Sequence, residues 1–106
     1  MKMKNVVSAE EVLARQLEDP AFRAEWERTS LARAVALEVV KYRAEHDLSQ
    51  AALARRLGVS QPVVARLEQG DHAPTWETLR RLAHEMGVRF VVDVDPSEGA
   101  RLREVS

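Results

Sequence analysis

The amino-acid sequence predicts a mainly α-helical fold, with an N-terminal helical arm, a central set of helices and one short C-terminal β-strand. Apolar residues recur at helical spacing along most of the 106 residues. The four glycines and four prolines fall between these stretches, as boundaries do. The period changes to strict alternation only at residues 88–94. A chain of this length makes one domain, or one domain with an arm.

Residues 1–30 predict the arm, as two short helices. Ser8 and Glu11 have the spacing of a capping box, and the helix that follows reaches Glu18 before Asp19-Pro20 ends it. Pro20 suits the first turn of a second helix that reaches about residue 28. The apolar positions of both helices are the candidate partner-binding residues Val12, Leu17, Phe22 and Trp26.

A long helix and a later shorter one frame the middle of the chain. Apolar positions 31, 35, 39 and 42 keep a helical period to about His46, with Thr29 or Ser30 as the cap. Thr75 caps the later helix, whose positions 79, 82, 83 and 86 share one face before Gly87 ends it.

Between them, two short helices are predicted at 49–57 and 61–69. Gly58 accepts the left-handed conformation that ends the first, and Ser60 caps the second, which carries Pro62 in its first turn.

Residues 88–95 predict a strand, closed by Pro96. Its alternating apolar residues are Val88, Phe90, Val92 and Val94. One strand cannot satisfy its own backbone groups, which leaves two alternatives. A second copy or a partner pairs with the strand through these residues, or the strand lies over the helices as a terminal extension. Residues 96–106 are predicted to be a polar, frayed tail.

Two short helices joined by a tight turn with glycine, at residues 48–70, are the pattern of a helix-turn-helix unit. The second helix of such a unit enters the major groove of DNA. Its expected outward residues include Gln61, which can pair with adenine, and Arg66, which can pair with guanine. The expected shared core is Leu53, Ala54, Leu57, Val59, Val64 and Leu67.

The stretch resembles the XRE/Cro family of phage-repressor-like helix-turn-helix domains, over about residues 35–87. The matching positions are Val39, Tyr42, Arg43, Ser49-Gln50, Leu53-Ala54, Gly58-Val59-Ser60, Val64, Leu67-Glu68, Gly70, Pro74-Thr75 and 79–87. The resemblance implies a five-helix domain over residues 31–87. It implies that Gln50 touches the DNA backbone and supports Gln61, and that Gln61, Pro62 and Arg66 contact bases. The candidate DNA-binding residues are Gln50, Ser60, Gln61, Pro62, Val63, Arg66, Arg55 and Arg43.

Three positions depart from the family pattern. Asp47 stands where glycine is frequent, and Asp tolerates left-handed geometry. Pro62 cannot hydrogen-bond a base through its side chain. Trp76 stands where leucine is usual, and we expect it to be a core or dimer-contact residue.

The arm with its DPAFRAEW segment and the strand VRFVVDV are similar to HigA-like antitoxins of toxin–antitoxin modules. This resemblance implies a homodimer that represses its own operon at a near-palindromic operator and neutralises a small basic, mRNA-cleaving toxin. Two alternatives stay open: a stand-alone repressor of the XRE family, or a protein-interaction module whose helix-turn-helix does not read DNA.

The charge is unevenly spread, although 16 Lys and Arg face 17 Asp and Glu. Residues 41–66 hold five basic and two acidic groups, and residues 67–106 hold five basic and eight acidic groups. We therefore expect weak non-specific DNA affinity and a need for dimerisation. The acidic part suits a basic protein partner.

Other classes are disfavoured by composition. The absence of cysteine excludes disulfides and thiol chemistry and fits a cytoplasmic protein. Residues 1–7 are too polar for a signal peptide or membrane span. His46, His72 and His84 lie on separate predicted elements without metal-site spacing, so we expect no metal, no cofactor and no enzyme activity.

Overall fold

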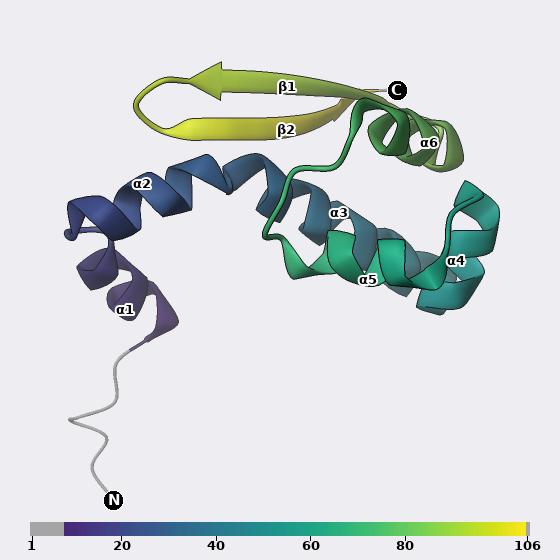
Figure 1. Cartoon of the computed structure of the whole chain (residues 1–106), viewed down its shortest axis with the longest axis horizontal. Helices are drawn as coiled ribbons and strands as arrows, with labels where there is room; N and C mark the ends of the chain where they lie inside the picture. Colours follow the sequence, from purple (N-terminus) through teal and green to yellow (C-terminus); the bar gives the residue numbers. More distant parts are fainter. Residues whose placement is uncertain (1–7, 106) are drawn as a thin grey trace, which may run out of the picture.

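The computed structural model describes residues 8–105, which form six helices and a two-stranded antiparallel sheet (Figure 1). The elements are α1 (Ala9–Gln16), α2 (Pro20–Arg28), α3 (Ser30–His46), α4 (Gln50–Leu57), α5 (Gln61–Gln69), α6 (Trp76–Met86), β1 (Arg89–Asp95) and β2 (Gly99–Val105). The mainly helical fold class is confirmed. The domain after the arm holds four of these helices rather than five, and the hairpin follows them. The segment 1–7, with its signal-peptide prediction, lies outside the described residues.

Side-chain caps fix most helix starts as the sequence predicts. The hydroxyl of Ser8 accepts from the Glu11 N–H at 3.1 Å, that of Ser49 from Ala52 at 3.0 Å, and that of Thr75 from Thr78 at 3.2 Å. At the other end of α3, Asp47 takes the left-handed conformation at φ 51°, as expected of a residue in a position that favours glycine.

The caps at Thr29, Ser30 and Ser60 differ from the prediction. Thr29 and Ser60 precede α3 and α5 without a side-chain cap bond. The Ser30 hydroxyl instead donates to the Glu27 carbonyl at 2.7 Å and accepts from the Ala100 N–H at 2.6 Å. Ser30 therefore joins the α2–α3 junction to the hairpin.

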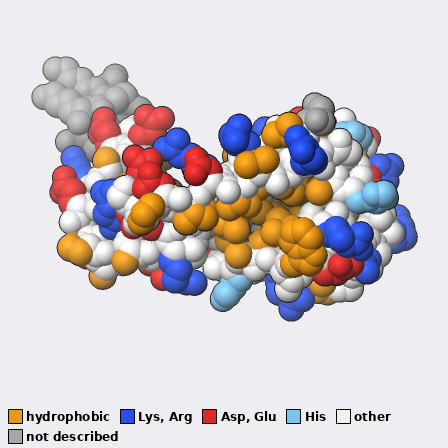
Figure 2. Space-filling model, turned by 90° about the horizontal axis from the view of Figure 1, so that it is seen from above, with side chains coloured by type: hydrophobic (Ala, Val, Ile, Leu, Met, Phe, Trp, Pro, Cys, Tyr) orange, Lys and Arg blue, Asp and Glu red, His pale blue; other side chains and the backbone are white. Residues whose placement is uncertain are grey.

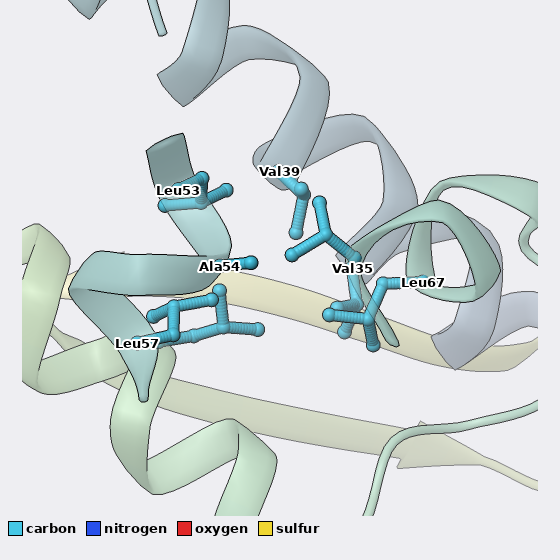
Figure 3. Close-up of a cluster of buried hydrophobic side chains, with 8 residues drawn as sticks. Val35, Val39, Leu53, Ala54, Leu57 and Leu67 are labelled. Carbon is cyan, nitrogen blue, oxygen red and sulfur yellow. The ribbon is translucent and has the colours of Figure 1, made fainter. Parts of the chain in front are cut away.

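The core gathers around α3, which crosses the middle of the domain. Helix α5 and strand β2 pack against α3, and α4 packs against α5 and α6. Figure 3 shows side chains of α3, α4 and α5 converging on this core. Its buried members are Val35, Val39, Leu53, Ala54, Leu57, Val64, Leu67 and Leu82. Phe90 and Leu102 of the hairpin cover it from outside.

The expected single strand and frayed tail are wrong, because residues 99–105 form β2 and pair with β1. Asp95 accepts from the Ser97 N–H at 2.8 Å and starts a tight turn, after which Gly99 adopts φ 94°. Val92 lies opposite Leu102 in the register. The sequence alone indicates a polar tail because Leu102 is the main apolar residue of this segment. A single apolar residue does not produce the alternating pattern that predicts a strand.

The arm has a looser attachment than the other helices. Neither α1 nor α2 buries a residue, and α1 extends away from the domain in Figure 1. Helix α2 is held by Trp26, which stacks on Phe22 at 6.3 Å and lies under the Arg33 guanidinium at 3.4 Å. In the range 8–105, every helix is too short or too polar to cross a membrane.

Candidate DNA-binding surface

Helices α4 and α5 form the predicted helix-turn-helix unit, joined by a turn at Gly58. The Arg81 guanidinium of α6 donates to the carbonyls of Leu57 at 2.8 Å and Gly58 at 3.2 Å. These bonds satisfy the C-terminal end of α4, where positive charge is favourable. The turn is thus held by α6, a contact between residues 24 positions apart that the local pattern does not reveal.

Burial of Val64 and Leu67 against the core sets which face of α5 meets solvent. Gln61, Pro62 and Arg66 are exposed, as the sequence predicts. Val63 is half-buried at the margin of this face. The surface formed by Gln61, Pro62, Arg66 and Gln69 is called the α5 face below.

Ser60 precedes this face and has a free hydroxyl for a physical reason. An N-cap side chain bonds the N–H of the second or third helical residue. Here the second is Pro62, which has no N–H, and the Val63 N–H donates to the Ser60 carbonyl at 3.1 Å. The exposed Ser60 hydroxyl is therefore left without a cap bond and can face a phosphate.

A chain of side chains orients Gln61 from beneath. The Gln61 amide donates to Gln50 Oε1 at 2.7 Å, and Gln50 Nε2 donates to Glu68 Oε1 at 3.1 Å. Arg43 of α3 grips Glu68 with two bonds, at 2.6 and 2.8 Å. The expected support of Gln61 by Gln50 is present, and it extends two residues deeper into the fold.

The Arg43–Glu68 ion pair, which ends this series of hydrogen bonds, is partly buried. The side chains of Arg43 and Glu68 keep 24% and 11% of their exposure. Hydrogen bonds from Arg43 lower the pKa of the Glu68 carboxyl, against burial, which raises it, and Gln50 lowers it further. Glu68 therefore stays charged and acts as a fixed acceptor for Gln50.

The basic block of residues 41–66 is largely neutralised in the fold. Arg43 pairs with Glu68, Lys41 with Glu38 at 3.7 Å, and Arg56 with Glu85 at 3.3 Å. Among the described residues, Arg55 and Arg66 have no carboxylate partner, and both are exposed. Two exposed arginines, Arg55 on α4 and Arg66 on α5, therefore carry the unpaired positive charge of this block.

Gln69 is a candidate that the sequence reasoning missed. It is exposed and lies three residues after Arg66 on the same side of α5. The i+3 spacing from Arg66 was the available signal. Its position just before Gly70 made it read as the end of the helix only.

The other predicted site residues lie elsewhere. In the arm, Val12 is exposed, whereas Leu17 and Trp26 line one hollow of about 150 Å³ and Phe22 stacks on Trp26. On the hairpin side, Val88, Phe90 and Val92 line a groove against α6, and Val94 is exposed beyond it.

Trp76 is not a core residue, because it is 78% exposed. It opens α6 and lines the same groove as Phe90. The expectation of a core role is therefore wrong, and the dimer-contact alternative stays a prediction.

Fold and surface together define a DNA-binding helix-turn-helix domain. A helix-turn-helix family profile matches residues 39–92, which is half of the chain. The chain belongs to this family, in its XRE-type form.

Individual proteins to which the chain is similar include an antitoxin and an HTH-type transcriptional regulator. The chain is 34% identical over 72 residues to Antitoxin HigA1 of Mycobacterium tuberculosis, a match that covers 68% of this chain and 48% of that protein. It is 38% identical over 49 residues to an uncharacterised HTH-type transcriptional regulator of Methanocaldococcus jannaschii, covering 46% of this chain and 74% of that protein. The chain thus spans about half the length of the first relative. No solved structure matches it.

Proposed function

We propose that the chain is a sequence-specific transcriptional repressor that binds a near-palindromic operator as a homodimer. The α5 faces of two copies enter successive major grooves about 34 Å apart. Gln61 and Arg66 read base edges, while Ser60, Arg55 and Gln50 contact phosphates. Arg43 supports Gln50 through Glu68 and contacts no base in this arrangement.

One observation carries the proposal: the oriented Gln61 and an unpaired Arg66 are both on the exposed side of α5. A side chain held in place before binding loses less conformational freedom when it meets a base. The bond from Gln61 to Gln50 leaves one N–H and the carbonyl oxygen of the Gln61 amide available. Arg66 has donors available for guanine or phosphate because no carboxylate of residues 8–105 pairs with it.

The test measures binding to the DNA upstream of the gene by fluorescence anisotropy at two salt concentrations. Arg66→Ala and Gln61→Ala should each weaken specific binding by about 5- to 150-fold, which corresponds to about 1–3 kcal/mol. Arg101→Ala is the matched control, because it removes the same charge from the exposed hairpin. Equal affinity of Arg66→Ala and Arg101→Ala would contradict the assignment.

The second part of the proposal is an antitoxin role, in which the arm captures a small basic, mRNA-cleaving toxin. Two observations favour it. The described arm buries no residue, so its apolar side chains still have surface to cover. Residues 8–28 also hold six acidic and three basic groups, which suits a basic partner. HigA1, the relative from Mycobacterium tuberculosis, is described as an antitoxin.

Co-expression with the neighbouring gene product tests this part. The double variant Val12→Asp, Phe22→Asp should abolish co-purification of the partner and leave operator binding intact. Loss of both would show that the arm is only structural. An intact complex in this variant would exclude the arm as the surface that captures the partner. Absence of a co-purified partner from the wild type would leave a stand-alone repressor, and a chain that captures the partner without binding DNA would be an interaction module.

A further inference from the structure

Strand β1 offers a free edge next to an apolar groove. Within residues 8–105, β1 pairs with β2 along one edge and with no other strand. In Figure 1 it is the outermost element on its side of the molecule. Unpaired backbone donors and acceptors on such an edge are a template for a further strand.

The groove beside this edge is largely apolar. It has a volume of about 240 Å³ and lies between α6 and β1. Figure 2, which views the molecule from the β1 side, shows a hydrophobic patch across the middle of this face. Val92 is 40% exposed and Val94, farther along the strand, is 71% exposed. Together with Trp76, which lines the groove, they are three of the six large apolar residues that are exposed within residues 8–105.

The charges of β1 are self-complementary in the antiparallel direction. Arg89 stands near the start of the strand and Asp93 near its end, with Val91 midway. A two-fold axis at Val91 therefore places Arg89 of one copy opposite Asp93 of the other, twice. On the apolar side, the same register places Phe90 opposite Val92 of the second copy.

A shift of the axis to Val92 fits less well. It would place Arg89 opposite Asp95, whose carboxylate already accepts from the Ser97 N–H at 2.8 Å and hydroxyl at 2.7 Å. It would also place Val91 opposite Asp93, an apolar residue against a charge. The Val91 register avoids both.

We propose that two copies of this chain pair through their β1 edges, antiparallel about Val91, to form a four-stranded sheet. The interface is isologous, and its two-fold axis matches the symmetry that a near-palindromic operator requires. Each copy extends the apolar groove of the other, so that Trp76 gains a covered surface. This inference specifies how the homodimer of the proposed function forms, and it rests on that function.

A charge-swap experiment on the full chain tests the pairing, with association measured by sedimentation. Arg89→Asp alone, or Asp93→Arg alone, places like charges opposite each other twice and should weaken self-association on the order of ten-fold or more. An equimolar mixture of the two variants restores opposite charges in the mixed pair and should dimerise as tightly as the wild type. Arg103→Asp is the control, because it makes the same change on β2, opposite Val91 but away from the β1 edge.

Several results would overturn the inference. These are a monomeric wild type, an Arg89→Asp chain that dimerises like the Arg103→Asp control, or a mixture that stays monomeric. Loss of the co-purified partner protein in Arg89→Asp, with the dimer intact, would assign the edge to that partner instead. Failure of the proposed function would give a different result. Arg66→Ala would then bind DNA as tightly as the wild type, while the mixture of charge-swapped variants would still dimerise.

Discussion

Arg43 is a predicted DNA contact that acts indirectly in the fold, by holding other side chains in place. Its match to the family helix placed it among the DNA-contact candidates. In the fold its guanidinium binds both carboxylate oxygens of Glu68 and donates to the Leu48 carbonyl at 3.1 Å. A planar guanidinium that donates two hydrogen bonds holds its carboxylate partner in one place. Arg43 therefore fixes Glu68 and, through it, the Gln50 side chain that bonds to Gln61.

Arg43→Ala should therefore destabilise the domain by about 2 kcal/mol, because it leaves Glu68 partly buried without its cation. It should also weaken operator binding, since Gln50 loses a fixed acceptor. Urea unfolding gives the first quantity and anisotropy the second. Arg80→Ala is the comparison, because the Arg80–Glu77 pair is exposed and should contribute far less. If the two variants unfold at the same urea concentration, the structural role of Arg43 is excluded.

The hairpin is the element on which the fold departs most from the sequence prediction. Its docking depends on a close approach between the turn and the α2–α3 junction. The Ala100 N–H donates to the Ser30 hydroxyl, and a Cβ added at Gly99 would lie 2.7 Å from that oxygen and 3.1 Å from the Glu27 carbonyl. Gly99 also has φ 94°, which L-residues rarely adopt.

Gly99→Ala should cost about 1–3 kcal/mol of stability and undock the hairpin, because both backbone strain and steric overlap oppose it. Gly87→Ala is the matched control, since Gly87 also has positive φ, at 68°, but an added Cβ meets nothing within 4 Å. Hydrogen exchange at Phe90 and Leu102, with urea unfolding of both variants, measures the difference. An equal loss of stability in both variants would mean that the close approach of Gly99 to Ser30 does not stabilise the fold.

At the scale of the whole molecule, stability should depend on pH through the contact between β2 and α3. A hydrogen bond with Glu38 raises the pKa of Glu104 to about 7, helped by burial and by the charges of Glu38 and Glu45, against Lys41. The folded chain then holds a proton that the unfolded chain has lost. Between pH of about 4.5 and 7, stability should fall as pH rises, and it should be level above that window.

The comparison of wild type with Glu104→Gln isolates this effect, because the amide cannot titrate. Urea midpoints measured from pH 5 to 8 should fall for the wild type and stay flatter for the variant. One proton allows at most about 1.4 kcal/mol per pH unit, and solvent screening at this site reduces it. Parallel pH curves for the two proteins would exclude the shared proton. Glu68, whose pKa is lowered, loses its contribution only as pH falls through the acid range, outside this window.

Local signals were enough for the helices and for most of the α5 face. Ser49 and Gly58 delimit α4 through a cap and a left-handed residue, effects that act within four residues. Val64 and Leu67 mark the buried side of α5, and so place Gln61 and Arg66 on the other side. Gln69 was missed because the same local reading ended the helix at its position.

The sequence by itself determined the helical class, the helix-turn-helix unit and its outward residues, because caps, period and turn residues are short-range in the chain. Only the tertiary structure decided what depends on residues far apart. Examples are the Arg43–Glu68 support, the Arg81 contact with Gly58, the exposed Trp76 and the pairing of residues 99–105 with β1. A polar strand such as β2 has too little alternation to be recognised alone. Its backbone becomes ordered because β1 supplies hydrogen bonds and α3 supplies an apolar surface for Leu102.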